Sequence, residues 1–248
     1  MEKTQLVAIQ GATTVIATEG RRMTRLFITP LSPRLFLMEM LATFQLCVGF
    51  NVLRPLAEKE TYLGHLYSFA ALHFYLTLSE NPTNPTTTLV HILRKGISMK
   101  LGVLTIVAQF VGAFVAAVYQ NVLWARGILE LLSDPHVCSY PLQTNLLKAF
   151  GTELVSSFLF QLTLLKSEEQ EIRVRANMIA IALTSLVYAG GHLTGAIFNP
   201  ALAFSMHLNC FSEKFWNYIL VYWIAPCLGS VLVVIAWDEI LPLLHREA

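Results

Sequence analysis

The strongest structural signal in the chain is Gly191-His-Leu-Thr-Gly-Ala-Ile-Phe-Asn-Pro-Ala-Leu-Ala-Phe204. Asn is a preferred N-cap residue and Pro suits the first helical position, so a helix is predicted to begin at Asn199-Pro200-Ala201. The apolar run that follows, to about Leu208, is too short to cross a bilayer, which takes about 20 helical residues. The stretch therefore predicts a half-helix that ends inside the membrane.

A second Asn-Pro pair stands 115 residues earlier, at Asn84-Pro85-Thr86. Two further landmarks recur at an offset of 114 residues. Residues 39–44 are similar to residues 153–158, and residues 109–112 correspond to residues 223–226. Three pairs in the same order at nearly one interval indicate an internal duplication.

The composition is that of a membrane protein. Of the 248 residues, 55% are hydrophobic and 13% are charged, with a mean hydropathy of +0.57, whereas soluble domains carry about 25% charged residues. A net charge of +1 without a Lys/Arg cluster gives no support for a nucleic-acid partner. The cysteines show no paired metal-ligand spacing, so neither a metal site nor another cofactor is expected.

Hydropathy predicts six spans that are nearly free of charge. They cover residues 35–52, 62–78 and 101–123 in the first repeat and residues 149–165, 176–189 and 215–236 in the second. Because each repeat holds an odd number of spans, the second repeat enters the membrane upside down, which places a solute site at the midplane. The predicted fold is an all-α membrane protein with six transmembrane helices and two re-entrant half-helices in an inverted 3+3 repeat.

The predicted organisation has five parts. Residues 1–33 are expected to form a cytoplasmic tail, 34–123 the first repeat, 124–147 a connecting loop, 148–240 the second repeat and 241–248 a short cytoplasmic tail. Of the 17 Lys and Arg residues, 12 fall on the side that this topology gives to the two termini. The positive-inside rule then predicts that both termini are cytoplasmic.

Two half-helices that face each other have an electrostatic consequence. A helix N-terminus carries roughly half a positive charge and several N–H groups without intrahelical acceptors. If the tips at Asn84 and Asn199 meet near the midplane, they oppose cations and protons, while their carboxamides can bond small neutral solutes. Bare backbone at that depth must be buried or line a wet cavity, so a water-lined passage is predicted.

With these features the chain resembles the aquaporin (major intrinsic protein) family over residues 33–244. The motifs that carry the resemblance are Glu39-x-x-Ala-Thr-Phe, Asn84-Pro85-Thr86, Ala108-Gln109-x-x-Gly112-Ala113, Glu153, Gly191-His192-x-x-Gly195-Ala196-x-x-Asn199-Pro200-Ala201 and Tyr222-Trp223-x-x-Pro226-x-x-Gly229. The resemblance implies one pore per chain and a homotetramer in the lipid bilayer.

Two positions depart from the family's usual pattern. Thr86 stands where the first motif usually has Ala, and Leu202 stands where the outer filter usually has Arg. Together with Cys210, these departures resemble the superaquaporin branch, the eleven and twelve subgroup, and more closely the eleven type. That branch implies an intracellular membrane, notably the endoplasmic reticulum, and water, glycerol and hydrogen peroxide as solutes. Residues 81–83 are a rival first motif, although the residues that follow favour Asn84.

The missing Arg predicts a wide, apolar filter. Leu202 would form its wall and the family's arrangement adds Ala196, while Val187 and Gly64 are placed there by counting back from the motifs. Such a filter should admit solutes with carbon backbones and weaken the outer barrier to cations. The Thr86 hydroxyl is expected either to bond to a backbone carbonyl or to face the lumen.

Three other residues have alternative interpretations. Glu39 and Glu153 lie inside spans, where acids are usually functional; their equivalent places favour accepting N–H bonds from the re-entrant loops, and carrying protons is the alternative. Cys210 is a buried residue, an oligomer contact or a redox position. The sequence thus predicts a passive channel, with an occluded structural protein and a secondary transporter as alternatives, and no nucleophile and base pair indicates an enzyme.

Overall fold

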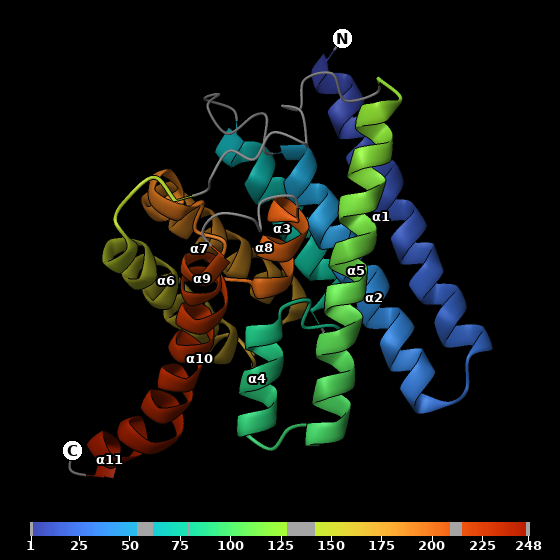
Figure 1. Cartoon of the computed structure of the whole chain (residues 1–248). Coiled ribbons are helices and arrows are strands. Elements are labelled where there is room, and N and C mark those ends of the chain that lie inside the picture. Colours follow the sequence, from blue (N-terminus) through green and yellow to red (C-terminus); the bar gives the residue numbers. More distant parts are fainter. Residues whose placement is uncertain (1, 54–61, 79, 128–141, 209–214, 247–248) are drawn as a thin grey trace.

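The computed structural model describes residues 2–53, 62–78, 80–127, 142–208 and 215–246 (Figure 1). Regular structure in these ranges is helical throughout, so the prediction of an all-α fold is confirmed. The helices follow the predicted order of spans and half-helices.

The first repeat consists of α2 (Leu31–Leu53), α3 (Tyr62–Thr77), the half-helix α4 (Pro85–Leu93) and α5 (Met99–Ala125). The second repeat consists of α6 (Leu146–Lys166), α7 (Ile172–Thr194), the half-helix α8 (Pro200–His207) and a composite last helix. That last helix joins α9 (Phe215–Ile219), the π-helical turn η2 (Leu220–Ile224), α10 (Ala225–Ile235), the π-helical turn η3 (Ala236–Ile240) and α11 (Leu241–Arg246).

Four of the described helices are long and apolar enough to cross a membrane by length and composition alone. They are Leu31–Leu53, Met99–Ala125, Ile172–Thr194 and Phe215–Leu244. The other two predicted spans fall short for different reasons: α3 has 16 described residues, and α6 carries Lys148 and Glu153. Because Glu153 is completely buried inside the protein, its carboxyl group does not face lipid.

The two half-helices enter the bundle from opposite ends, as an inverted repeat requires. In Figure 1, α4 lies in the lower half and α8 in the upper half, and their N-terminal ends approach each other in the middle. The two ends that carry the Asn-Pro pairs therefore lie at the centre of the bundle.

The two repeats pack their helices in the same way. Gly112 of α5 lies directly on α2, where an added Cβ would sit against the carbonyl oxygen of Met40. Gly229 of α10 lies on α6, where an added Cβ would sit against the carbonyl oxygen of Leu154. Only glycine lets the two backbones approach this closely.

The structure corrects one detail of the predicted repeat. Residues 109–112 were expected to correspond to residues 223–226, which pairs Gly112 with Pro226. In the structure Gly229 takes the place of Gly112, so this pair of helices is related by an offset of 117 residues. The offset of 114 assumed a constant spacing, whereas backbone contact with the neighbouring helix decides which residue must be small.

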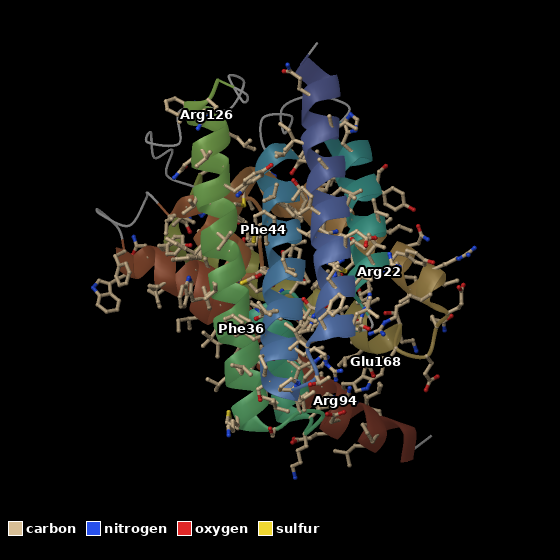
Figure 2. The ribbon with its side chains drawn as sticks, turned by 90° about the vertical axis from the view of Figure 1, so that its right-hand side faces the viewer. Arg22, Phe36, Phe44, Arg94, Arg126 and Glu168 are labelled. Carbon is tan, nitrogen blue, oxygen red and sulfur yellow. The ribbon has the colours of Figure 1, made fainter. Side chains whose placement is uncertain are left out.

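A helix that the sequence analysis did not predict precedes the first repeat. The helix α1 (Glu2–Phe27) runs antiparallel to α2 along the side of the bundle (Figures 1 and 2). It turns a partly polar face to the bundle, with Thr13, Thr14, Arg21 and Thr24 buried. Its outer face exposes apolar side chains, among them Val15, Ile16, Met23 and Leu26. The same exposed side also carries the charged residues Glu19, Arg22 and Arg25.

The contact between α1 and α2 includes a buried cation. The guanidinium of Arg21 donates hydrogen bonds to Gln45 Oε1 of α2 at 2.8 Å and to Thr18 Oγ1 at 3.1 Å. Near the end of α1, Arg25 forms an ion pair with Glu80 at 2.8 Å. The helix is therefore fixed to the bundle by polar bonds.

The chain ends differ from the expected pair of tails on one side. The start of α1 and the end of α11 lie at opposite ends of the bundle (Figure 1), and residues 241–246 continue the last helix instead of leaving it. The polar residues in 1–33 predicted a cytoplasmic tail. In the structure the polar face of α1 packs on α2, so the same residues are compatible with a place beside the spans.

Candidate functional site

Each half-helix begins at an asparagine that caps it. The Oδ1 atom of Asn84 accepts a hydrogen bond from Thr86 N at 2.9 Å. The Oδ1 atom of Asn199 accepts from Ala201 N at 3.0 Å and from Leu202 N at 3.2 Å. These bonds satisfy N–H groups that the first turn leaves without partners.

The two asparagines also hold each other's loops. Asn84 Nδ2 donates to the carbonyl oxygen of Phe198 at 3.2 Å, and Asn199 Nδ2 donates to the carbonyl oxygen of Thr83 at 3.0 Å. Each residue that provides a carbonyl directly precedes the other asparagine. A carboxamide nitrogen carries two N–H groups, so one from each side chain can still donate to a solute.

The residues before the asparagines have unusual backbone conformations. Thr83 has φ +53° and Phe198 has φ +36°, in the left-handed region that non-glycine residues rarely adopt. Such a conformation costs about 1–3 kcal/mol and persists where the surroundings enforce it. Both tips therefore combine the same unusual backbone conformation with a reciprocal hydrogen bond.

Glu153 fixes the loop before α8. Its Oε1 atom accepts from Thr194 Oγ1 at 2.6 Å and from Ile197 N at 3.1 Å, and its Oε2 atom accepts from Phe198 N at 2.6 Å. The hydroxyl of Tyr222 in turn donates to the carbonyl oxygen of Thr194 at 2.6 Å. Two of the three bonds to the carboxyl group come from backbone N–H groups, those of Ile197 and Phe198.

Glu39 has the equivalent place before α4, with a different set of donors. Thr83 N donates to its Oε1 atom at 2.7 Å, as does Gln109 Nε2 at 2.7 Å. Asn81 Nδ2 donates to its Oε2 atom at 3.0 Å. The rival asparagine Asn81 thus anchors the loop, and Asn84 is the residue that faces the second half-helix.

The Thr86 hydroxyl meets neither of the two expectations for it. It donates to Asn84 Oδ1 at 2.8 Å and accepts from Gln161 Nε2 of α6 at 2.9 Å. Gln161 Nε2 also donates to Thr87 Oγ1 at 2.9 Å. The threonine therefore links the first half-helix to α6, a contact that an alanine could not make.

Two cavities lie along the line of the half-helices. The larger, about 270 Å³, is lined by residues of α2 to α7, including Thr87, His91 and Gln161. The smaller, about 20 Å³, lies between the two tips and is lined by Asn84 and Asn199. A cavity can hold a water molecule once its water-occupied volume reaches about 10–15 Å³, so the smaller one accommodates a single water.

The predicted filter residues divide into two groups. Leu202 and Ala196 are buried and line the smaller cavity beside the asparagines. Val187 is buried on α7 and Gly64 is exposed on α3, and neither contributes to the lining of the two cavities. Cys210 lies outside the described residues.

The lower end of the larger cavity is charged. Arg94 forms ion pairs with Asp238 at 3.0 Å and with Glu168 at 3.5 Å, and Figure 2 shows Arg94 and Glu168 together at this end. Within the described residues no three His, Cys, Asp or Glu side chains are placed to hold a metal ion.

Sequence reasoning missed several residues of the site. Gln161 lies in a predicted span outside every motif, whereas Thr194 and Tyr222 stand within the quoted motif stretches but were given no role. A polar side chain at an otherwise apolar position in a span was the available signal, since such groups need a bonding partner in the membrane interior. Which partner each one finds depends on contacts between helices.

The fold and these contacts agree with comparisons to known proteins. The family described as "Major intrinsic protein" matches residues 63–237. Aquaporin-11 of Homo sapiens is 39% identical over 218 residues, which cover 86% of this chain and 80% of the human protein. Aquaporin-12 of Mus musculus is 31% identical over 177 residues, which cover 69% of this chain and 61% of the mouse protein.

A solved structure shows the same fold at low sequence identity. The X-ray structure of the aquaglyceroporin from Plasmodium falciparum matches with a TM-score of 0.73 and 17% identity, covering 88% of this chain and 100% of that chain. The match supports the arrangement of spans and half-helices described above.

Proposed function

The chain belongs to the major intrinsic protein family, the aquaporins, and on this premise we propose that it is a passive transmembrane channel for water and small neutral solutes such as glycerol and hydrogen peroxide. Members of this family are channels and not enzymes. The observation that carries the proposal is the pair of half-helix tips, bonded to each other through Asn84 and Asn199 beside a cavity that both line.

The geometry at the tips supports selection for neutral solutes. Two helix N-termini, each with roughly half a positive charge, point toward one midplane cavity and oppose cations there. The second N–H of each asparagine offers a bond to an oxygen lone pair, which water and glycerol both have. A neutral solute can therefore replace part of its hydration shell there, whereas a cation cannot.

The carboxyl groups give little support to the transporter alternative. The oxygens of Glu39 and Glu153 already accept bonds from the loops and from neighbouring side chains. A proton carrier has to release such bonds in each cycle, and the loops would lose their anchor. The occluded-pore alternative is supported by one observation, the small volume of the midplane cavity, about 20 Å³.

The deciding experiment uses the purified full-length protein in liposomes. Volume changes are followed after separate gradients of an impermeant sugar, of glycerol and of hydrogen peroxide, the last with an enclosed peroxide-sensitive dye. A channel should give flux that is proportional to each gradient and does not saturate. Saturable or ion-coupled uptake would favour a transporter, and protein-free rates for all three would favour the occluded alternative.

Leu202→Arg tests the proposed filter. A guanidinium would fill apolar space beside Asn199 and present donors that hold water better than a carbon backbone. We expect glycerol permeability to fall by more than water permeability, measured in the same liposomes. Leu202→Met keeps an apolar side chain of similar volume and should leave both rates within about twofold. Equal loss of both rates in the arginine variant would contradict the filter.

We infer the membrane orientation from α1 together with the basic residues. We propose that the C-terminus is cytoplasmic, because Arg22 and Arg94 lie toward that end of the bundle (Figure 2). Since α1 runs antiparallel to α2, the N-terminus then lies on the opposite, lumenal side. This differs from the topology with two cytoplasmic termini.

A glycosylation tag measures this orientation. An Asn-x-Thr sequon in a flexible extension at the N-terminus should be glycosylated in microsomes, whereas the same extension at the C-terminus should not be. Glycosylation of the C-terminal extension alone would show that the topology is the reverse of the proposed one. Glycosylation of neither extension would support two cytoplasmic termini.

Two further proposals rest on the family relationship. A homotetramer would cover part of the apolar surface, and native mass spectrometry of the detergent-solubilised protein should show four chains. Similarity to aquaporin-11 supports an intracellular membrane such as the endoplasmic reticulum. Fractionation of the untagged protein with organelle markers tests that location.

A further inference from the structure

Aromatic side chains lie between the larger and the smaller cavity. Phe74 of α3 and Phe160 of α6 line both the larger and the smaller cavity. Phe198, in the loop before α8, lines the smaller one. All three side chains are at most 6% exposed, so they occupy the interior between the cavities.

The three rings are in contact in series. The ring centroids of Phe74 and Phe160 are 6.1 Å apart, and those of Phe160 and Phe198 are 5.0 Å apart. Both distances lie within the range of about 4.5–7 Å for interacting aromatic pairs. The rings come from three separate elements, so together they extend across the line between the cavities.

The surrounding bonds hold these rings in place. The backbone N–H of Phe198 donates to Glu153 and its carbonyl accepts from Asn84, which fixes the residue on both sides of its Cα. Phe160 directly precedes Gln161, whose amide bonds to two threonines of α4. A ring with this support can rotate only if its neighbours give way, since protein interiors are close-packed.

We propose that Phe74, Phe160 and Phe198 form an apolar collar that is the narrowest part of the pore and sets which solutes pass. The collar admits water-sized neutral molecules one at a time. Three-carbon polyols pass only when a ring is displaced. This proposal rests on the channel function and assigns the main size selection to the collar rather than to Leu202.

Volume and polarity both support this role. The smaller cavity, about 20 Å³, fits one water molecule, and a polyol is several times larger. The rings also offer no hydrogen bonds in place of those that a polyol makes with water, and a buried polar group without a partner is costly. Without its hydration shell, a solute gains no compensating bond from a ring edge until it reaches the asparagines.

Phe160→Leu and Phe74→Leu test the collar. Leucine keeps an apolar side chain in the core but removes the ring, so the variants should still fold. We expect the ratio of glycerol to water permeability in liposomes to rise roughly tenfold, the factor that corresponds to lowering one barrier by about 1.4 kcal/mol. Phe160→Trp should lower both rates because it enlarges the ring.

Phe44→Leu is the matched control. Phe44 of α2, labelled in Figure 2, packs on Tyr119 of α5 with ring centroids 5.7 Å apart. It is absent from the lining of both cavities. The same loss of a ring there should leave the permeability ratio unchanged. Size-exclusion profiles and melting temperatures of all variants establish that each is folded.

The outcomes separate the collar from the channel function. An unchanged ratio in folded Phe160→Leu and Phe74→Leu, with a conducting wild type, would overturn the collar and leave the channel standing. A silent wild type with conducting variants would support the collar and overturn the channel function. If glycerol crosses the wild type as fast as water, or if folded variants stay silent, the collar is not the main barrier.

Discussion

Replacing Glu153 by alanine is expected to lower the free energy of unfolding by at least about 3 kcal/mol. The change removes the acceptor of Ile197 N, Phe198 N and Thr194 Oγ1, all buried at the centre of the bundle. Each donor left without an acceptor costs about 1–3 kcal/mol. Because whole domains are stable by about 5–15 kcal/mol, most of the folded population should be lost on mild heating.

Thermal unfolding in detergent, followed by size-exclusion chromatography, measures this loss. Glu153→Gln keeps one acceptor oxygen in nearly the same shape and should lie between alanine and wild type. Glu169→Ala, at an exposed position of the loop after α6, is the surface control and should change stability by less than about 0.5 kcal/mol. A melting temperature of Glu153→Ala equal to that of the surface control would contradict the anchor role.

The equivalent change in the first repeat should be milder. Glu39 accepts from one backbone N–H, that of Thr83, and otherwise from the side-chain amides of Asn81 and Gln109. Side-chain amides can turn toward other acceptors or water, whereas a backbone N–H is fixed by the fold. We therefore expect a smaller loss of unfolding free energy for Glu39→Ala than for Glu153→Ala. The comparison measures how strongly each loop is stabilised by its carboxyl group.

Hydropathy and capping rules predicted the spans and both half-helices because their signals are local. Asn84-Pro85 and Asn199-Pro200 each indicate the start of a helix within two residues, and a run of apolar residues indicates a span. The inverted arrangement followed from the number of spans in each repeat. Helix ends such as that of α7, which extends to Thr194 beyond the predicted 189, depend on packing and were less well predicted.

The helix α1 was missed because hydropathy does not say which face of a helix meets the protein. Its Arg21 and three threonines are polar enough to suggest a tail, yet they are buried against the bundle. Its exposed side mixes apolar residues with the charged Glu19, Arg22 and Arg25, so neither face has the uniform character of a soluble amphipathic helix. The average hydropathy of α1 therefore does not indicate which of its faces contacts α2.

The candidate site was predictable where its residues share a short segment. Leu202 and Ala196 lie within three residues of Asn199 and line its cavity. Val187 and Gly64 were placed by counting along other helices, where a rotation of about 100° per residue decides which side chain meets the pore. The phenylalanine collar comes from three separate elements, and no local pattern marks such a set.

Gly112→Ala and Gly229→Ala are each expected to destabilise the protein by at least about 3 kcal/mol, the upper end of the usual range for overpacking. At Gly112 an added Cβ would meet the backbone of α2, 3.1 Å from Phe44 N and closer still to a carbonyl oxygen. At Gly229 it would lie 3.0 Å from Phe158 N of α6. Backbone atoms cannot rotate aside, so the helices must separate.

Gly151→Ala is the matched control, because an added Cβ there has nothing within 4 Å. Alanine favours a helix over glycine by about 1 kcal/mol, so Gly151→Ala should be slightly stabilised. Gly112→Ala and Gly229→Ala should lose stability although they share this gain in helix propensity. Melting temperatures of the three variants in one detergent make the comparison. Similar losses at Gly112 and Gly229 would show that the offset of 117 residues joins equivalent positions. A loss of stability in only one of the two variants would contradict the equivalence of Gly112 and Gly229.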